Sequence, residues 1–336
     1  MRTILTSGKG SMLVLAALLL SFIAGCSRNE PAPPVKQRPF KICQGGILAT
    51  LPLIAKEKGF FREEGIAAEI ELVGDGKAAM GKFLNGQCDA SLTGEFPLVR
   101  QSFDRDDIVI IATLASSDNG IKVVARRDQG INELGDLAGK RIGVSKGTIS
   151  GFFLDQFLKK NHIPADRITI LDISHAEITD ALKRGEIDAF AGSDIAYLKG
   201  KQAIPDQQRV VFTEPGLTNH AACLVVRKEW LAANPGVAHS VLKALLRAEK
   251  ELSQNSEELT KMLSQKLNIR HDDLKSIIAE QHNKVTLDQV LLLALEDEAR
   301  WMRENGVVKT KALPNYLRFL DPSVLKGIDP SAVKLK

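Results

Sequence analysis

The sequence predicts an α/β protein with two lobes, each built on a sheet rich in parallel strands. Three observations support this fold class. Once 26 N-terminal residues are set aside, about 310 of the 336 residues remain, which exceeds the usual size of one hydrophobic core. Short β-rich runs alternate with amphipathic stretches, as in right-handed βαβ units. One helix-to-strand segment also occurs twice.

The expected elements follow that alternation along the chain. The first set of strands is predicted at 40–43, 67–73, 90–93 and 109–115, with helices at 48–58 and 77–85. The second set comprises strands near 121–125, 141–144, 168–172 and 189–191, with helices at 149–161 and 178–184. From Pro235 to Gly306, apolar residues recur at helical spacing, which predicts a helical C-terminal region.

The repeated segment is residues 83–90, which recurs 99 positions later as residues 182–189. Each copy carries a glycine after a helix, at the position that favours a left-handed backbone, and then enters a strand. The strands end at glycines with acidic residues nearby, Gly94 beside Glu95 and Gly192 before Asp194. Ligands bind at the carboxyl ends of strands in open parallel sheets, so two such edges predict one cleft. The alternative is an ordinary helix-to-strand turn that occurs twice by chance.

The N-terminus has the features of a secretory signal. Arg2 and Lys9 precede an apolar run at 12–24, which is too short to span a bilayer. Its ending, Ile-Ala-Gly-Cys, resembles the bacterial lipobox, which implies cleavage before Cys26 and a lipid on that cysteine. A cleaved signal with a chance cysteine is the alternative. Residues 27–39 are polar with four prolines and form an expected flexible linker. We therefore expect a lipid-anchored protein in the periplasm or on the outer face of the cell membrane.

Charge and cysteine content exclude other classes. The formal net charge is +4, and loss of Arg2 and Lys9 leaves about +2, which gives no case for nucleic acid. Cys43, Cys88 and Cys223 remain after Cys26, and they fit either buried free thiols or a Cys43–Cys88 disulfide. The sequence contains no Cys-x-x-Cys motif and no paired histidines at a ligand spacing, so it predicts no metal site.

Two motifs resemble a known family. Residues 52–66 (PLIAKEKGFFREEGI) and 136–144 (DLAGKRIGV), the latter followed by Lys146-Gly147-Thr148, are similar to solute-binding proteins of ABC importers. The similarity is to the nitrate, sulfonate and taurine type, whose relatives include binders of thiamine pyrimidine precursors. It implies a two-lobed periplasmic-binding-protein fold of type II, with two crossover strands. The implied partners are a small solute and a permease with its ATPase.

The resemblance also implies the domain limits. Lobe 1 is discontinuous, from 40–116 and 217–320, lobe 2 spans 117–216, and 321–336 form a C-terminal tail. Hinges are expected near 116–118 and 214–216, where polar, glycine and proline residues allow backbone rotation.

Candidate binding residues lie where strands end. The loop of Gly45, Gly46 and Ile47 precedes the first helix and presents backbone amides to a negative charge, or else is a plain βα turn. Thr148 and Ser150 open the long helix of the second lobe, either as ligand hydroxyls or as N-caps.

The acidic residues complicate a purely anionic ligand. Glu95 and Asp194 suit an amine, so amide-rich helix starts and a carboxylate together predict a zwitterion or polar heterocycle, unless each acid only stabilises its own helix N-terminus. The remaining candidates are Thr93, Gly94, Phe96, Ser116, Gly192, Asn219 and His220. For His220 a structural role is the alternative, and for Phe96 it is core packing.

The sequence predicts a receptor without enzymatic activity. The six histidines show no ligand spacing, and no nucleophile elbow or phosphate loop occurs. We expect a monomer with no cofactor and no metal that captures a sulfonate-, taurine- or nitrate-like solute. The alternatives are a binder of a pyrimidine or other heterocyclic vitamin precursor, and a ligand-sensing lipoprotein with a signalling partner.

Overall fold

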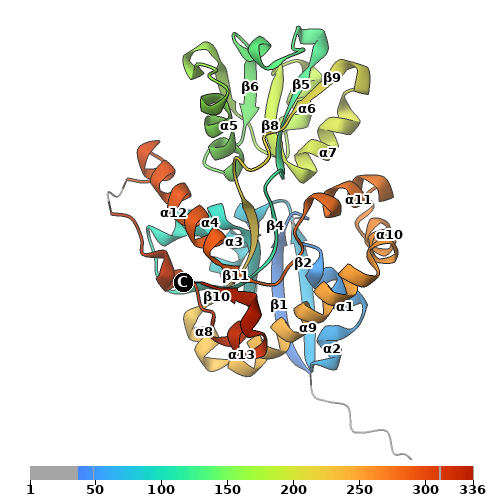
Figure 1. The fold of residues 1–336 in the computed structure, drawn as a ribbon, viewed down its shortest axis with the longest axis vertical. Helices are drawn as coiled ribbons and strands as arrows, with labels where there is room; N and C mark the ends of the chain where they lie inside the picture. Colours follow the sequence, from blue (N-terminus) through green and yellow to red (C-terminus); the bar gives the residue numbers. More distant parts are fainter. Residues whose placement is uncertain (1–36, 48, 310–311, 336) are drawn as a thin grey trace, which may run out of the picture. The chain divides into compact units, whose positions relative to one another are not determined.

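The computed structural model describes residues 37–47, 49–309 and 312–335, except for the side chain of Asp194. The signal segment, Cys26 and most of the predicted linker lie outside the described residues. Residues 37–336 form one compact unit (Figure 1). Among the described helices, none combines the length and the apolar character that a membrane crossing requires.

The first sheet has the strand order β2-β1-β3-β10-β4. Its strands are β1 (Arg38–Gly45), β2 (Ile66–Val73), β3 (Ala90–Gly94), β4 (Ile108–Ser117) and β10 (His220–Arg227). β1 pairs in parallel with β2 and β3, whereas β10 is antiparallel to β3 and β4.

The second sheet repeats this plan with the order β7-β6-β8-β5-β9. Its strands are β5 (Ile121–Arg126), β6 (Arg141–Val144), β7 (Thr169–Asp172), β8 (Ala189–Ser193) and β9 (Arg209–Phe212). β6 is parallel to β7 and β8, and β5 is antiparallel to β8 and β9. Both sheets are therefore mixed, with the predicted parallel pairs joined to antiparallel ones. The antiparallel pairs all involve β5 or β10, the strands that follow the two crossings between the sheets.

The two crossings lie next to each other. Residues 118–120 connect β4 to β5, and residues 213–219 connect β9 to β10. The amide of Gly216, at φ +78°, donates to the carbonyl of Asp118 at 3.1 Å. Each predicted hinge segment therefore contains a residue of this contact.

Helices cover the sheets and fill the C-terminal third. The first sheet is followed or flanked by α1 (Leu51–Glu57), α2 (Phe60–Glu63), α3 (Gly76–Leu84) and α4 (Glu95–Ser102). The second sheet carries α5 (Ile149–Lys160), α6 (Ile178–Arg184) and α7 (Asp194–Ala203). The predicted helical region contains α9 (Pro235–Gln254), α10 (Ser256–Leu267), α11 (His271–Glu280) and α12 (Gln289–Glu304). Outside its predicted bounds, α8 (Lys228–Ala233) precedes it and α13 (Ser323–Ile328) follows it. The segment 321–336, expected as a tail, contains α13 and β12 (Val333–Lys334), which pairs with β11 (Leu287–Asp288).

The repeated segment has the same local structure in both copies. Gly86 and Gly185 follow α3 and α6 with φ of +74° and +70°. Asp89 then accepts the amide N–H of Lys41 at 2.7 Å, and Asp188 accepts that of Arg141 at 2.8 Å. Each aspartate thereby ties the start of β3 or β8 to the neighbouring parallel strand. The repeated segment therefore has equivalent surroundings in the two sheets.

Candidate functional site

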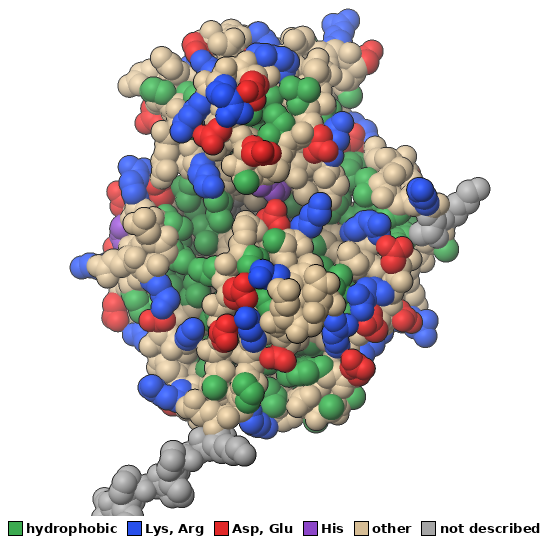
Figure 2. Space-filling view, turned by 180° about the vertical axis from the view of Figure 1, so that it is seen from behind, with side chains coloured by type: hydrophobic (Ala, Val, Ile, Leu, Met, Phe, Trp, Pro, Cys, Tyr) green, Lys and Arg blue, Asp and Glu red, His purple; other side chains and the backbone are tan. Residues whose placement is uncertain are grey.

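One cavity of about 620 Å³ is lined by residues from both sheets. Its wall comes from the carboxyl ends of six strands that run parallel within their sheets: β1, β2 and β3 in the first, β6, β7 and β8 in the second. This is the edge at which α/β sheets bind ligands. Figure 2 shows hydrophobic side chains gathered in a hollow of the surface that lysine and arginine side chains border.

The charged lining is mainly basic. Lys77, Arg100, Lys146 and Lys199 line the cavity, and Asp75 is the one acidic residue among its described lining residues. Arg100 pairs with Asp104 at 2.7 Å, whereas the described residues include no carboxylate partner for Lys146 or Lys199. The remaining lining is largely glycine backbone and apolar side chains. The arrangement suits an anion with an apolar portion.

Gly45 and Gly46 are both needed, for different reasons. An added Cβ at Gly45 would lie 2.4 Å from backbone atoms of Asp75 and Gly76, so glycine lets β1 approach the start of α3. Gly46 has φ of +71°, and an added Cβ would meet open space. At Gly45 the close approach is thus made to the protein's own backbone, whereas Gly46 exposes its backbone to the cavity.

His220 lies against Gly94 in the cavity wall. An added Cβ at Gly94 would lie 2.7 Å from His220 Nε2, so the imidazole packs directly on the end of β3. Nδ1 of His220 is buried and has no hydrogen-bond partner among the described residues. Both residues line the cavity. Nε2 lies on the side of Gly94, whereas the buried Nδ1 lies on the side of Gly120, which is outside the lining.

Glu95 points away from the cavity into the core. Its side chain has no exposed surface, and one oxygen accepts the amide N–H of Ala221 at 2.7 Å. Glu298 of α12 is also buried, and neither of its oxygens has a hydrogen-bond donor among the described residues. Burial, together with the charge of Glu95, holds the pKa of Glu298 well above its usual range. A proton on Glu298 satisfies the pair, so Glu95 gives no support to an ammonium site in the cavity.

The start of α5 brings two predicted hydroxyls beside His175. Thr148 lines the cavity at the N-cap position, but its hydroxyl donates to the carbonyl of Ser145 at 2.7 Å instead of capping the helix. Ser150 is fully buried, and its Oγ lies 3.3 Å from His175 Nε2. His175 Nδ1 in turn lies 3.9 Å from Asp75 Oδ2. The His175 imidazole keeps the pKa of Asp75 below its ordinary value.

The structure brings together a majority of the predicted binding residues. Those that line the cavity are Gly45, Gly46, Ile47, Thr93, Gly94, Phe96, Thr148 and His220. The residues outside its lining are Glu95, Ser116, Ser150, Gly192 and Asn219. Asp194 begins α7, and its side chain is outside what the structure describes.

Asp75, His175 and Lys199 line the cavity without having been singled out from the sequence. Gly45 was selected because ligands bind at the carboxyl ends of parallel strands, which we call the strand-end rule. The same rule also selects Asp75, which follows β2, and His175, which follows β7. Trp301 of α12 was missed as well. Its indole lies between Phe96 and Phe152, with ring centroids at 5.9 and 5.5 Å, and no local sequence pattern indicates this contact.

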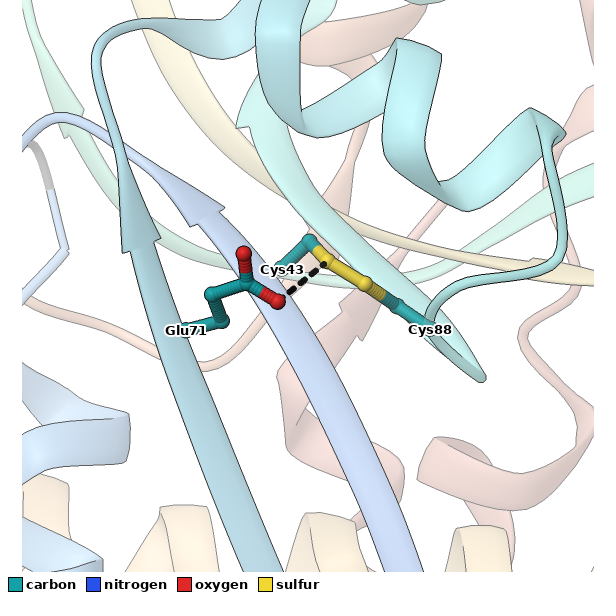
Figure 3. A group of neighbouring side chains, drawn as sticks. All are labelled: Cys43, Glu71 and Cys88. Atoms are coloured by element: carbon teal, nitrogen blue, oxygen red, sulfur yellow. Dashed lines mark hydrogen bonds between the residues drawn. A yellow bond between two sulfur atoms is a disulfide. The ribbon is translucent and has the colours of Figure 1, made fainter.

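A disulfide stands beside the cavity wall. Cys43, two residues before Gly45, is bonded to Cys88 in the turn that enters β3 (Figure 3). Glu71 Oε2 lies 4.0 Å from Cys43 Sγ, and the possible metal-ligand atoms of Cys43, Glu71 and Cys88 all lie within 4.8 Å of one another. Both sulfurs are used in the disulfide, and Glu71 pairs with Lys41 at 3.0 Å and Lys82 at 2.8 Å. The cluster therefore joins β1, β2 and β3 and offers no free metal ligand set.

Known proteins are similar to this chain in sequence or in fold. A binding protein from Brucella abortus (strain 2308) is 25% identical over 252 residues, covering 71% of this chain and 76% of that protein. The alkanesulfonate-binding protein SsuA from Xanthomonas axonopodis pv. citri, solved with MOPS, has a TM-score of 0.71 and 17% identity over 89% of this chain and 98% of that one. The periplasmic nitrate-binding protein NrtA from Synechocystis PCC 6803 has a TM-score of 0.66 and 14% identity over 88% and 89%. The family model described as NMT1/THI5 like matches residues 49–259, and the chain belongs to that family.

Proposed function

We propose that this protein is the extracytoplasmic solute-binding component of an ABC importer and that it captures a small organic anion in the cavity. The basic lining carries the proposal: four cationic side chains and exposed glycine backbone meet one carboxylate, Asp75. The names of SsuA and NrtA, which bind sulfonate and nitrate, support an anionic solute. Taurine is a weaker candidate, because Glu95 is not available to its ammonium group.

The cavity size and lining favour an organic solute over a bare inorganic ion. Met80, Leu84, Phe96 and Ile195 are among its apolar lining residues. A sulfonate with a short hydrocarbon chain places its charge near the lysines and its chain against this apolar wall.

Closure about the two crossings is the proposed mechanism. The solute contacts residues of both sheets at once, so it favours the state in which the two walls are close together. The permease and ATPase then recognise that state. We propose that the lipid on Cys26 and the linker keep the receptor at the membrane surface.

A thermal-unfolding panel tests the solute class. The purified protein is heated with alkanesulfonates, taurine, nitrate, bicarbonate, pyrimidines or amino acids. A ligand at 100 times its Kd adds about 2.7 kcal/mol to the free energy of unfolding. We expect alkanesulfonates to give the largest shift, and a shift confined to pyrimidines or cationic amines contradicts the proposal.

A labelling experiment tests the anchor. Cells that express the protein take up an alkyne-tagged palmitate, and the label on the purified protein is measured. We expect a labelled wild type and an unlabelled Cys26→Ala variant, with Cys223→Ala as the control that keeps the label. Equal labelling of the Cys26→Ala variant contradicts lipidation at this residue.

A further inference from the structure

Asp75 and His175 face each other across the cavity. Asp75 caps α3 beside the first sheet, where its Oδ1 accepts the amide N–H of Ala78 at 2.8 Å. His175 follows β7 of the second sheet, and its Nδ1 lies 3.9 Å from Asp75 Oδ2. This is an ion-pair distance, longer than a hydrogen bond. The pair therefore connects the two walls that the solute must also connect.

The other ring nitrogen of His175 fixes the orientation of the imidazole. Nε2 lies 3.3 Å from Ser150 Oγ. The order Ser-His-Asp matches that of a hydrolase triad, but Ser150 is fully buried and absent from the cavity lining, so a solute in the cavity does not reach its hydroxyl. Ser150 holds the ring so that Nδ1 points at Asp75.

The pair joins a carboxylate to an imidazole. The pKa of Asp75 is held below its ordinary value, first by His175 and then by the Ala78 amide, so the carboxylate stays ionised. Imidazoles generally gain a proton between pH 8 and pH 5. Once His175 is protonated, both ring nitrogens are donors, and Nδ1 carries a charge that Asp75 attracts.

Other charged or titratable groups line the same cavity as the pair. The charged or titratable groups are Lys77 of α3, Lys146 before α5, Arg100 of α4, Lys199 of α7 and His220 of β10, all in the cavity lining. On the loop of His175 itself, Asp172 accepts the amide of Lys146 at 3.0 Å, and Glu177 accepts the Ser174 hydroxyl at 2.7 Å. The lysines oppose a further positive charge in the empty cavity, whereas a bound anion offsets them.

We propose that capture of an anion in this cavity is coupled to uptake of a proton by His175, with Asp75 as the counter-charge that the closed state brings to it. The inference rests on the proposed function and adds its pH regulation. The anion and Asp75 both favour the imidazolium form of His175, so binding of the anion raises the fraction of His175 that is protonated. By linkage, a low pH raises the affinity for the anion. A partly exposed ion pair of this kind changes the Kd by about fivefold.

Calorimetric titration of 1-pentanesulfonate tests the coupling, because this probe remains a monoanion over the whole range. We expect the wild-type Kd to rise about fivefold from pH 5.5 to pH 8.0, with a binding heat that depends on the ionisation enthalpy of the buffer. In His175→Gln and Asp75→Asn the Kd should change less than twofold. Asparagine keeps the N-cap of α3, so the second variant removes charge alone. The exposed His239→Gln is the control and should behave as wild type.

A measurement without ligand separates this inference from the proposed function. Trp301 contacts Phe152 and Asp155 of α5, so in a Trp230→Phe background its emission reports contact between α12 and α5. We expect the emission to change between pH 8.0 and 5.5 and this change to be lost with Asp75→Asn or His175→Gln. A pH profile shared by all variants, in binding or in emission, overturns the coupling. Failure of pentanesulfonate to bind at any pH contradicts the anion receptor instead, and the emission result then still decides whether the charge of the Asp75–His175 pair changes the contact between α12 and α5.

Discussion

Trp301 on α12 donates its indole N–H to Asp155 Oδ2 on α5 at 2.8 Å. α12 packs against α4 of the first sheet, and α5 belongs to the second, so this hydrogen bond joins the helices of the two sheets beside the cavity. Phe96, which lines the cavity, packs on the same indole. The contact is thus placed to stabilise the state in which the solute is enclosed.

Trp301→Phe removes the indole donor and keeps an aromatic ring between Phe96 and Phe152. A hydrogen bond to a partly exposed carboxylate contributes about 1 kcal/mol, so we expect the Kd for pentanesulfonate to rise about fivefold. Calorimetry measures it. Trp230→Phe, which changes a ring packed on Phe40, is the matched control. An unchanged Kd in the Trp301 variant would show that this contact does not favour the bound state.

Glu298→Gln should flatten the alkaline side of the stability profile. The pKa of Glu298 is raised in the folded protein. The stability that this residue contributes is therefore fully present below its pKa in the unfolded chain, near 4.3, and is lost as the pH rises toward its pKa in the folded protein. Each unit of that shift corresponds to about 1.4 kcal/mol. Gln cannot ionise, so we expect the variant to exceed wild type in free energy of unfolding at pH 8 but not at pH 4.

Urea denaturation at several pH values measures this difference. The exposed Glu304→Gln on the same helix serves as the control and should follow the wild-type curve. A Glu298→Gln variant whose loss of stability is the same at every pH would show that the carboxyl is not protonated in the fold.

Gly94→Ala should disturb the cavity through His220. The added Cβ would approach Nε2 of His220 to 2.7 Å, so the ring must move from the wall. We expect at least tenfold weaker binding of pentanesulfonate with a loss of about 1–3 kcal/mol in stability. Gly327→Ala, whose Cβ meets open space in α13, should leave binding unchanged. Wild-type affinity in Gly94→Ala would place His220 outside the binding set.

The Cys43–Cys88 disulfide should supply a large share of the stability. It closes a loop with a sequence separation of 45, for which chain entropy predicts about 4 kcal/mol. A Cys43→Ala, Cys88→Ala double variant should unfold at a correspondingly lower urea concentration. In the Cys223→Ala control, a reducing agent should lower the urea midpoint by as much as it does in the wild type. Equal midpoints for the wild type with and without a reducing agent would contradict the contribution.

The strand pattern predicted eight of the ten strands in the two sheets, and the edge where the cavity lies, because parallel βαβ units leave a strong local signal. It did not predict β9 and β10. Sequence does not show where β5 and β10 insert, since pairing depends on the path of the chain between the sheets. The strand-end rule placed Gly45 and Gly94 correctly at the cavity. It failed for Glu95, because a carboxylate at a helix start can turn to the core as easily as to the cavity. Trp301 depends on contacts 146 and more residues away, which no local pattern contains.

A comparison of solutes that differ in charge tests most directly whether the cavity prefers an anion. Calorimetry compares three solutes of similar size at pH 6.5: 1-pentanesulfonate, 1-pentanol and pentylamine. We predict that pentanesulfonate binds the protein, with a Kd at least a hundredfold lower than that of either other solute. Binding of pentylamine as tight as or tighter than that of pentanesulfonate would contradict it.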